Sequence, residues 1–208
     1  MSVFIKDLVN NILENTDNIP DVYPEGLLDD FGSRECYTNN ISWCLISKKW
    51  IDPLYEKIKG SNCIEVYAGR GLISKLLQDR GLNIKPYDDF SWKHMFEGNP
   101  YMFTEVEDKP ADVAVKEYEG KIDYIIASWI PYEDNKENKS SIKFAKAIKY
   151  KHPEATLIYI GEGIDGCNAC FEFFQYFDYI NFGNKLNKNF QQWEGIHDHI
   201  EFMKVRRK

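Results

Sequence analysis

One stretch of the sequence, residues 63–89, constrains this chain more than any other. It opens with a short apolar run, residues 63–68, which is rich in strand-forming residues and is interrupted by one acid, Glu65. Gly69 and Gly71 follow. Glycines in such a turn let backbone N–H groups approach a ligand closely. The stretch therefore predicts a buried strand that ends in a ligand-facing turn.

The residues after the glycines complete the unit. Four apolar residues recur at helical spacing within residues 72–77, and Gly81 ends this helix. A second short strand, residues 84–87, ends in Asp88 and Asp89. These acids lie about 20 residues past the glycines, where a carboxylate can accept both hydroxyls of a ribose. The order of strand, glycine turn, helix, strand and acid is typical of a nucleoside-binding unit.

The pattern E-x-x-A-G-x-G, residues 65–71, resembles the first motif of the class I S-adenosylmethionine-dependent methyltransferases, which usually reads E/D-x-G-x-G-x-G. Tyr67 stands where that family has its first glycine. The resemblance implies S-adenosylmethionine as the cofactor, with Glu65 anchoring the turn or the methionine amino group. It also implies that the turn contacts the cofactor through Tyr67, Ala68, Gly69 and Gly71.

The ribose and adenine contacts are less closely defined. Asp88 and Asp89 are both candidates for the ribose, and we favour Asp88 because it ends the strand more directly. Glu107 and Asp108, which follow the third predicted strand, are candidates for the adenine.

A second informative stretch, residues 121–132, places an apolar strand before the sequence Ser128-Trp129-Ile130-Pro131-Tyr132. In open α/β sheets, ligands bind at the carboxyl ends of strands, so Ser128 and Trp129 are further candidates for cofactor contact. The stretch loosely resembles the N/D/S-P-P-Y motif of amino-group methyltransferases. Trp129 occupies the polar position of that motif, so its adenine specificity is not carried over. A buried strand followed by a proline turn explains the same residues equally well.

Three side chains are candidates for orienting an acceptor or taking its proton: Ser128, Tyr132 and Glu162. Glu162 lies between two glycines after a predicted strand, a setting that is also common in turns without chemistry. The cofactor carries its own reactivity, so such an enzyme mainly aligns the acceptor and needs little acid–base machinery.

The order of the remaining elements predicts an α/β fold. Further strands are expected at residues 101–106, 122–127, 156–160, 179–182 and 199–205. Further helices are expected at residues 91–98, 111–118, 140–150 and 168–176. A terminal pair of strands after five βα units resembles the family's Rossmann-like, seven-stranded, mostly parallel sheet, with helices on both faces and an antiparallel last strand.

Residues 59–208 are expected to form this methyltransferase-like domain, and residues 1–58 an N-terminal helical extension packed on it. Within the extension we expect helices at residues 3–15, 41–48 and 52–58, the last one capped by Asp52 with Pro53 at its first position. Residues 16–40 hold prolines and glycines and are expected to form an irregular connection. This connection could cover the cofactor or substrate, be disordered, or simply wrap the domain.

The composition of the chain limits which classes of partner and which cellular location we expect. The net charge of −7 and the pI near 5.2 do not favour a broad nucleic-acid surface, which needs a clustered positive face. No stretch approaches the ~18 apolar residues of a membrane span, and the start of the chain lacks the apolar core of a signal peptide. Five cysteines without a disulfide pattern suit a reducing compartment. We therefore expect a cytoplasmic protein whose partner is a small-molecule cofactor.

A metal site is an alternative use of the C-terminal region. Cys167 and Cys170, with His197 and His199, supply four soft or borderline ligands. A zinc pair normally spaces its histidines by three to five residues, and a C-x-x-C pair is frequent by chance, so we assign no metal. No Ser-His-Asp or Cys-His nucleophile is predicted either, because none of the four histidines follows a recognisable nucleophile elbow.

The leading interpretation is an S-adenosylmethionine-dependent methyltransferase with an unidentified acceptor. A second hypothesis is a catalytically inactive protein of the same fold that holds a nucleoside cofactor or a protein partner, because Tyr67 and residues 128–132 depart from the family motifs. A nicotinamide-dependent enzyme is a third. Trp129, Tyr132 and Trp193 could line a pocket, although tryptophan in an apolar chain more often packs in the core.

Overall fold

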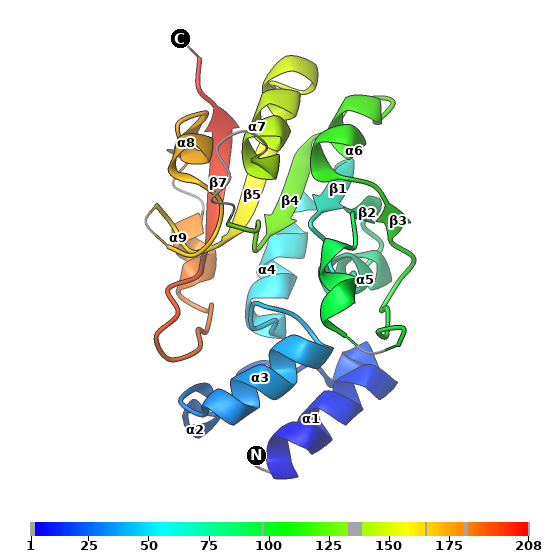
Figure 1. Ribbon diagram of the computed structural model, residues 1–208, viewed down its shortest axis with the longest axis vertical. Helices are drawn as coiled ribbons and strands as arrows, with labels where there is room; N and C mark the ends of the chain where they lie inside the picture. The colour runs from blue at the N-terminus through cyan, green and yellow to red at the C-terminus, as the bar shows by residue number, and fades with distance from the viewer. Residues whose placement is uncertain (1–2, 97, 133–138, 165, 181–182, 208) are drawn as a thin grey trace.

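The computed structural model describes residues 3–96, 98–132, 139–164, 166–180 and 183–207. In this part of the chain, a seven-stranded sheet with the order β3-β2-β1-β4-β5-β7-β6 forms the centre of the molecule (Figure 1). The strands are β1 (Cys63–Val66), β2 (Ile84–Asp88), β3 (Glu107–Asp108), β4 (Tyr124–Ser128), β5 (Thr156–Gly161), β6 (Phe177–Ile180) and β7 (His199–Val205). Of these seven strands, only β7 runs opposite to the other six, which confirms the predicted fold class.

The central strands are apolar because both of their faces are covered. Every residue of β1 and of β5 is buried, as expected for strands in a parallel sheet with helices on both sides. The register pairs Val66 at the end of β1 with Tyr87 on β2 and with Ala127 on β4. The carboxyl ends of these three strands therefore meet at one edge of the sheet.

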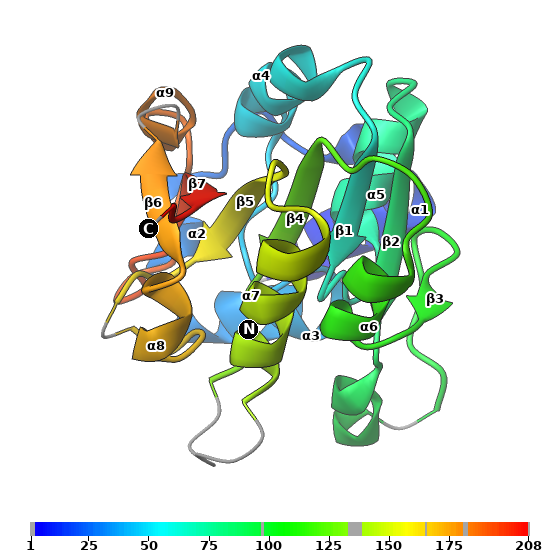
Figure 2. The same cartoon turned by 90° about the horizontal axis from the view of Figure 1, so that it is seen from above.

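Helices form a layer on each face of the sheet (Figure 2). One layer consists of α4 (Lys48–Ile58), α5 (Leu72–Asp79) and α9 (Gly183–Asn187), and the other of α6 (Ala111–Glu117), α7 (Ser140–Lys151) and α8 (Phe171–Phe174). Successive residues of β4 point to opposite faces of the sheet. Ile126 packs in the core on the side of α4, α5 and α9, and Ile125 in the core on the side of α6, α7 and α8.

The N-terminal helices lie below the carboxyl ends of the strands in Figure 1. They are α1 (Val3–Glu14), α2 (Glu25–Leu28) and α3 (Phe31–Asn40). The apolar stripe of α1 is buried through Ile5, Val9 and Ile12, so the predicted first helix is confirmed. These side chains belong to the same core as α4 and α5.

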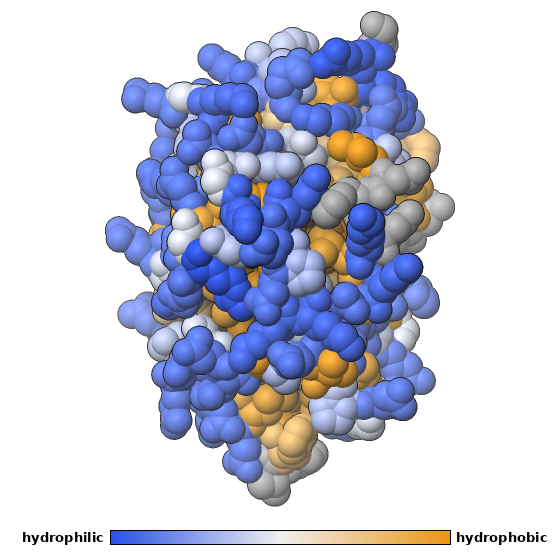
Figure 3. Space-filling model, turned by 180° about the vertical axis from the view of Figure 1, so that it is seen from behind, coloured by the Kyte–Doolittle hydropathy of each residue, from blue (hydrophilic) through white to orange (hydrophobic). Residues whose placement is uncertain are grey.

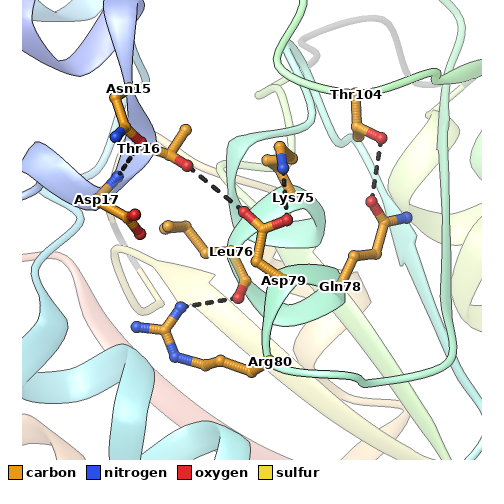
Figure 4. A network of polar contacts seen from close by, with 9 residues as sticks. All are labelled: Asn15, Thr16, Asp17, Lys75, Leu76, Gln78, Asp79, Arg80 and Thr104. Carbon is orange, nitrogen blue, oxygen red and sulfur yellow. Dashed lines mark hydrogen bonds and ion pairs between the residues drawn. The ribbon is translucent and has the colours of Figure 1, made fainter.

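Polar contacts also tie the short 3-10 helix η1 (Thr16–Asn18), which follows α1, to α5, as Figure 4 shows. The Thr16 hydroxyl lies 3.5 Å from Asp79, which also pairs with Lys75 one helical turn earlier. On the other side of α5, the Thr104 hydroxyl donates to Gln78 at 3.0 Å. Helix α5 is therefore fixed from both flanks.

Three expectations for the N-terminal region are wrong. Residues 16–40 are not irregular, because a short 3-10 helix, α2 and α3 occupy most of them. Helix α3 lacks a long apolar stripe, buries only Ser33 and Tyr37, and is capped by Asp30, which accepts from the Ser33 amide at 2.8 Å. Its sequence therefore gives little helical periodicity.

The segment 41–47 is not helical, and its backbone is held by side chains from elsewhere. The Tyr37 hydroxyl accepts from the Ile46 amide, and the Trp50 indole donates to the Leu45 carbonyl. Helix α4 begins at Lys48, so Pro53 lies inside the helix and is not its first residue. The division at residue 58 stays a proposal, and α4 on its N-terminal side packs against α5 and α9.

Other boundaries were also misplaced. Residues 101–106 form no strand, and β3 is confined to two residues. Helix α8 covers only part of the expected 168–176, since Asn168 forms a β-bridge with Pro131. Strand β6 begins at Phe177, earlier than the predicted 179–182, whose last two residues lie outside the described part.

The surface seen from behind is mostly hydrophilic and is broken by smaller apolar areas (Figure 3). None of the helices in the described ranges has the length and apolar character that crossing a bilayer requires.

Candidate ligand-binding site

A cavity of about 550 Å³ lies at the carboxyl ends of β1, β2 and β4. This volume is within the range of sites for small molecules and cofactors. The N-terminal region supplies part of its wall, through residues of α3 and of the segment 41–46: Arg34, Thr38, Ile41, Ser42, Trp43 and Ile46.

The structure brings most of the predicted site residues to this cavity. Those that line it are Glu65, Tyr67, Ala68, Gly69, Asp88, Asp89, Ser128 and Trp129. The following cofactor and acid–base candidates do not line it: Gly71, Glu107, Asp108, Tyr132 and Glu162. The assignment of these residues to cofactor contacts stays a prediction.

Tyr67 adopts the left-handed conformation, with φ of 54°. This region suits glycine and costs other residues about 1–2 kcal/mol. The ring packs edge-on against Phe144, with 5.7 Å between centroids, and the hydroxyl lies 3.5 Å from the Ser140 hydroxyl. Tyr67 thus adopts a backbone conformation that glycine takes without strain, and it adds an aromatic ring to the cavity wall.

The two glycines of the turn have different roles. Gly69 has φ of 56°, lines the cavity, and a Cβ there would meet nothing within 4 Å. Gly71 has φ of 77°, and a Cβ there would lie 2.8 Å from the side chains of Thr104 and Val106. Gly69 therefore leaves room at the cavity, whereas Gly71 allows the segment after η2 (Ser91–Met95) to pack closely.

Asp88 holds the turn together. Its carboxylate accepts from the Gly69 amide at 2.7 Å, the Phe90 amide at 2.7 Å and the Trp92 indole at 2.9 Å. Burial raises the pKa of Asp88, and these hydrogen bonds oppose the rise. Asp89 is exposed and accepts only from the Ser91 amide among the described hydrogen bonds. The carboxylate of Asp89 therefore accepts fewer hydrogen bonds from the protein than that of Asp88.

Glu65 lies behind the glycine turn and is buried. It accepts from the amide and hydroxyl of Ser74 at 2.9 and 2.5 Å, which ties β1 to α5. Burial raises the pKa of Glu65 to about 8, against the effect of these two bonds.

Arg70 is a cavity residue that the sequence analysis missed. Its guanidinium donates to the Asn39 carbonyl of α3 at 2.6 Å and to the Tyr101 carbonyl at 3.1 Å. It also lies over the rings of Trp92 and Phe96, 5.3 and 5.0 Å from their centroids. Arg70 links three segments around the cavity that lie about 30 residues apart in the sequence, so no local pattern pointed to it.

The turn after β4 is also strained. Trp129 has φ of 51°, and its amide donates to the Ile160 carbonyl at 2.7 Å. Its indole stacks on Trp43 at 5.6 Å and donates to Asp198 at 3.1 Å. Phe90, after β2, is left-handed too, so a non-glycine residue in this conformation follows each of three strand ends at the cavity. Such strain often clusters at binding sites.

Asp198 is another residue that the sequence analysis missed. It is 1% exposed, and its second carboxylate oxygen has no hydrogen-bond partner within the described residues. Burial raises the pKa of Asp198 to about 7. A neutral carboxylic acid would remove the cost of a buried charge at this position.

The three predicted acid–base residues differ in position. The Ser128 hydroxyl lines the cavity and lies 3.6 Å from the Cys44 thiol. Tyr132 is 55% exposed. Glu162 accepts from the amide and thiol of Cys167, each at 2.8 Å, and from the His197 amide at 3.0 Å. Although burial opposes it, these bonds hold the pKa of Glu162 below its usual value, which suits a fixed carboxylate.

The remaining candidates lie elsewhere. Glu107 pairs with Lys85 and Lys109 at 2.6 and 2.8 Å and does not line the cavity, and neither does Asp108. Trp193 is buried in the core, so it packs and does not line the cavity. Among the described residues, no group of three or more His, Cys, Asp or Glu side chains is placed to hold a metal ion.

Comparison with known proteins supports the fold. No protein-family model and no curated protein sequence matches the chain. Among solved structures, it is similar to an S-adenosylmethionine-dependent methyltransferase from Clostridium acetobutylicum, with a TM-score of 0.53 and 11% identity. The similarity covers 82% of this chain and 96% of the other. This chain has the class I methyltransferase fold.

Two further structures are similar at lower TM-scores. They are an rRNA methylase from Streptococcus thermophilus (TM-score 0.46, 12% identity, 76% of this chain and 96% of that one) and a TehB-like methyltransferase from Corynebacterium glutamicum (TM-score 0.47, 12% identity, 77% and 90%). At these identities the comparison concerns the methyltransferase fold and not the reaction.

Proposed function

We propose that this protein is an S-adenosylmethionine-dependent methyltransferase whose acceptor is still to be identified. One observation carries the proposal: the cavity lies where the sheet order reverses, at the carboxyl ends of β1, β2 and β4. From β1 the chain builds outward to β2 and β3, and then starts again on the other side with β4 and β5. Ligands of open α/β sheets bind at this switch point.

The residues present fit the cofactor. Gly69 leaves open space at the turn, and three acids, Glu65, Asp88 and Asp89, line the same part of the cavity. Aromatic rings that can interact with a positive sulfonium face the cavity from Tyr67 and Trp129. The similar protein from Clostridium acetobutylicum is itself named as dependent on S-adenosylmethionine, which supports the same cofactor here.

In this proposal S-adenosylmethionine supplies an activated methyl group, and the protein supplies alignment. Asp88 shapes the turn, and Asp88 or Asp89 accepts from the ribose hydroxyls. Ser128 and Trp129 lie at the next strand end, where an acceptor would approach the methyl group. Tyr132 and Glu162 lie outside the cavity lining, so we assign them no direct step.

A second candidate is a protein of this fold that binds the cofactor without catalysis. The observation that favours it is the turn after β4, where the Trp129 indole is already held by Trp43 and Asp198. Transfer of labelled methyl groups from S-adenosylmethionine to a panel of amines, hydroxyls and thiols separates the two candidates. Binding with no transfer to any acceptor would favour the second.

The test of the cofactor is isothermal titration with S-adenosylmethionine and S-adenosylhomocysteine, with NAD as the control. We expect the first two to bind and NAD not to bind. Binding of NAD alone would support the nicotinamide-dependent alternative, and binding of none of the three would contradict both enzyme proposals.

The five cysteines are all free, which is consistent with a reducing compartment, so we also propose a cytoplasmic location. Cell fractionation with an antibody against the protein tests this proposal.

A further inference from the structure

The cavity has two ends of different chemical character. Its wall follows the strand order from β2 through β1 and β4 to the segment after β5. Neighbouring strands lie about 4.8 Å apart, so the ends of β2 and β5 are separated by roughly 14 Å. The β2 end carries the carboxylates of Asp88 and Asp89, and Glu65 lies beside it on β1.

The β5 end is polar but not acidic. The lining residues from the turns after β4 and β5 include Pro131, Cys167 and Asn168, and the charge of Arg34 on α3 acts on Cys167. Of the described residues that line this end, none carries a carboxylate. The charge on this part of the wall is therefore that of Arg34.

The side chains of Arg34 and Arg70 differ in their contacts with the rest of the protein. Within the described ranges its guanidinium makes no hydrogen bond or ion pair, whereas Arg70 at the other end donates to two carbonyls and lies over two rings. Arg34 and Thr38 are four residues apart on α3, so they face the cavity together.

Arg34 lines the same cavity as Cys167, which lies in the loop after β5. Burial and the Glu162 carboxylate raise the pKa of the Cys167 thiol to about 11, and the nearby Arg34 charge opposes that rise. Glu162 does not line the cavity, and its oxygens already accept three hydrogen bonds from Cys167 and His197. It therefore leaves the Arg34 guanidinium unpaired.

An unpaired, partly buried guanidinium is suited to a planar or tetrahedral anion, which it binds with two parallel hydrogen bonds. The net charge of −7 makes the field of the whole protein unfavourable for anions, so recognition must come from this local charge. We propose that the β5 end of the cavity is the acceptor subsite and that it takes acceptors bearing a carboxylate or phosphate group, which Arg34 binds. This inference rests on the proposed function, because it assigns the acidic end to the cofactor.

Matched probes test the subsite. Benzoate and phenyl phosphate are compared with neutral benzamide by quenching of tryptophan fluorescence, since Trp43 and Trp129 line the cavity. The titrations use wild type, Arg34→Gln, Arg34→Lys and the control Arg207→Gln, with and without S-adenosylhomocysteine. Arg207 is an exposed arginine paired with Glu154 near the C-terminus, so the control removes the same charge far from the cavity.

We expect at least one anion to bind wild type and Arg207→Gln about 10- to 100-fold more tightly than benzamide, the range of a charge-assisted hydrogen bond. Arg34→Gln should remove this preference, and Arg34→Lys should restore part of it. A wild type without any preference for either anion, or an Arg34→Gln variant that keeps the preference and is folded by circular dichroism, would overturn the inference.

Parallel calorimetry with S-adenosylhomocysteine and 5′-methylthioadenosine, which lacks the amino-acid portion, separates this inference from the proposed function. Arg34→Gln should leave both affinities within about twofold of wild type. A selective loss of S-adenosylhomocysteine affinity in Arg34→Gln would show that Arg34 binds the cofactor's own carboxylate, which overturns the acceptor assignment. Failure of wild type to bind either nucleoside would count against the proposed function, while the anion preference would still decide the role of Arg34.

Discussion

The turn after β1 and the turn after β4 face the same cavity but are held in different ways. Each has a left-handed aromatic residue, Tyr67 or Trp129, and each is backed by a buried acid. The acid of the first turn, Glu65, bonds to Ser74 only nine residues away, whereas the Trp129 indole bonds to Asp198 across 69 residues. The first turn is thus organised locally and the second by the tertiary fold.

The largest expected effect concerns the two buried acids. Burial raises the pKa of Glu65 to about 8 and that of Asp198 to about 7, while both titrate near pH 4 in the unfolded chain. The native state therefore holds more protons between about pH 4 and pH 7–8, so the free energy of unfolding falls as pH rises through this window. Glu65→Gln and Asp198→Asn should each flatten this fall by up to about 4 kcal/mol.

Urea unfolding at about pH 4.5, 7 and 8.5 checks this prediction for both turns, because it reports the free energy of unfolding at each pH. Glu201→Gln is the matched control, because burial also raises the pKa of Glu201 but this residue lies on β7, in neither turn. If the free energy of unfolding of Asp198→Asn falls as steeply with pH as that of wild type, Asp198 is ionised in the native state. The second turn is then not backed by a neutral acid.

The next largest effect concerns packing at the first turn. Gly71→Ala should lower the free energy of unfolding by about 3 kcal/mol, because the new methyl group meets Thr104 and Val106 and the backbone is left-handed. Gly60 has the same φ of 77° but open space around it, so Gly60→Ala should cost only about 1 kcal/mol. Equal losses in the two variants would mean that close packing of residues 104–106 does not require Gly71.

The two turns also differ in how much of each could be predicted from the sequence. The strand, glycine turn and paired acids of residues 63–89 were recognised because their partners are close in sequence and their spacing is set by one βα unit. Trp43, Arg70 and Asp198 were missed as site residues because each acts through a contact made only in the folded chain. Periodicity carries no information on such contacts.

The N-terminal region shows the same limit. The strongly amphipathic α1 was predicted, whereas α3, which buries little and presents Arg34 and Thr38 to the cavity, was expected to be irregular. A helix whose polar face lines a cavity lacks the apolar stripe on which prediction depends.

A smaller effect distinguishes the two acids after β2. Asp88→Ala should lower the free energy of unfolding by about 2 kcal/mol, because it leaves the Gly69 and Phe90 amides and the Trp92 indole without their acceptor. Asp89→Ala should change it by less than about 0.5 kcal/mol, since Asp89 is exposed.

Titration with S-adenosylmethionine then locates the ribose contact. Asp88→Ala is expected to weaken binding by about 1–3 kcal/mol if its carboxylate binds the ribose. Unchanged affinity in Asp88→Ala, with weaker binding in Asp89→Ala, would move the ribose contact to Asp89.

The smallest expected effect is at the second turn. Trp43→Ala should lower the free energy of unfolding by about 1 kcal/mol, because Trp43 is 49% exposed and its described ring contact is the stack on Trp129. Trp43→Phe keeps a ring in place and should recover most of this loss in thermal melts. A loss well above 2 kcal/mol in Trp43→Ala would mean that the segment 41–47 depends on this stack.

A crystal structure of the complex with S-adenosylhomocysteine would show whether the cofactor occupies the acidic end of the cavity. We expect the adenosine over the end of β2, within hydrogen-bond distance of Asp88 or Asp89. The amino-acid portion should lie beside Gly69, and the β5 end near Arg34 should be left open. Adenosine bound beside Arg34 and Cys167, or ligand density outside the cavity, would contradict this placement.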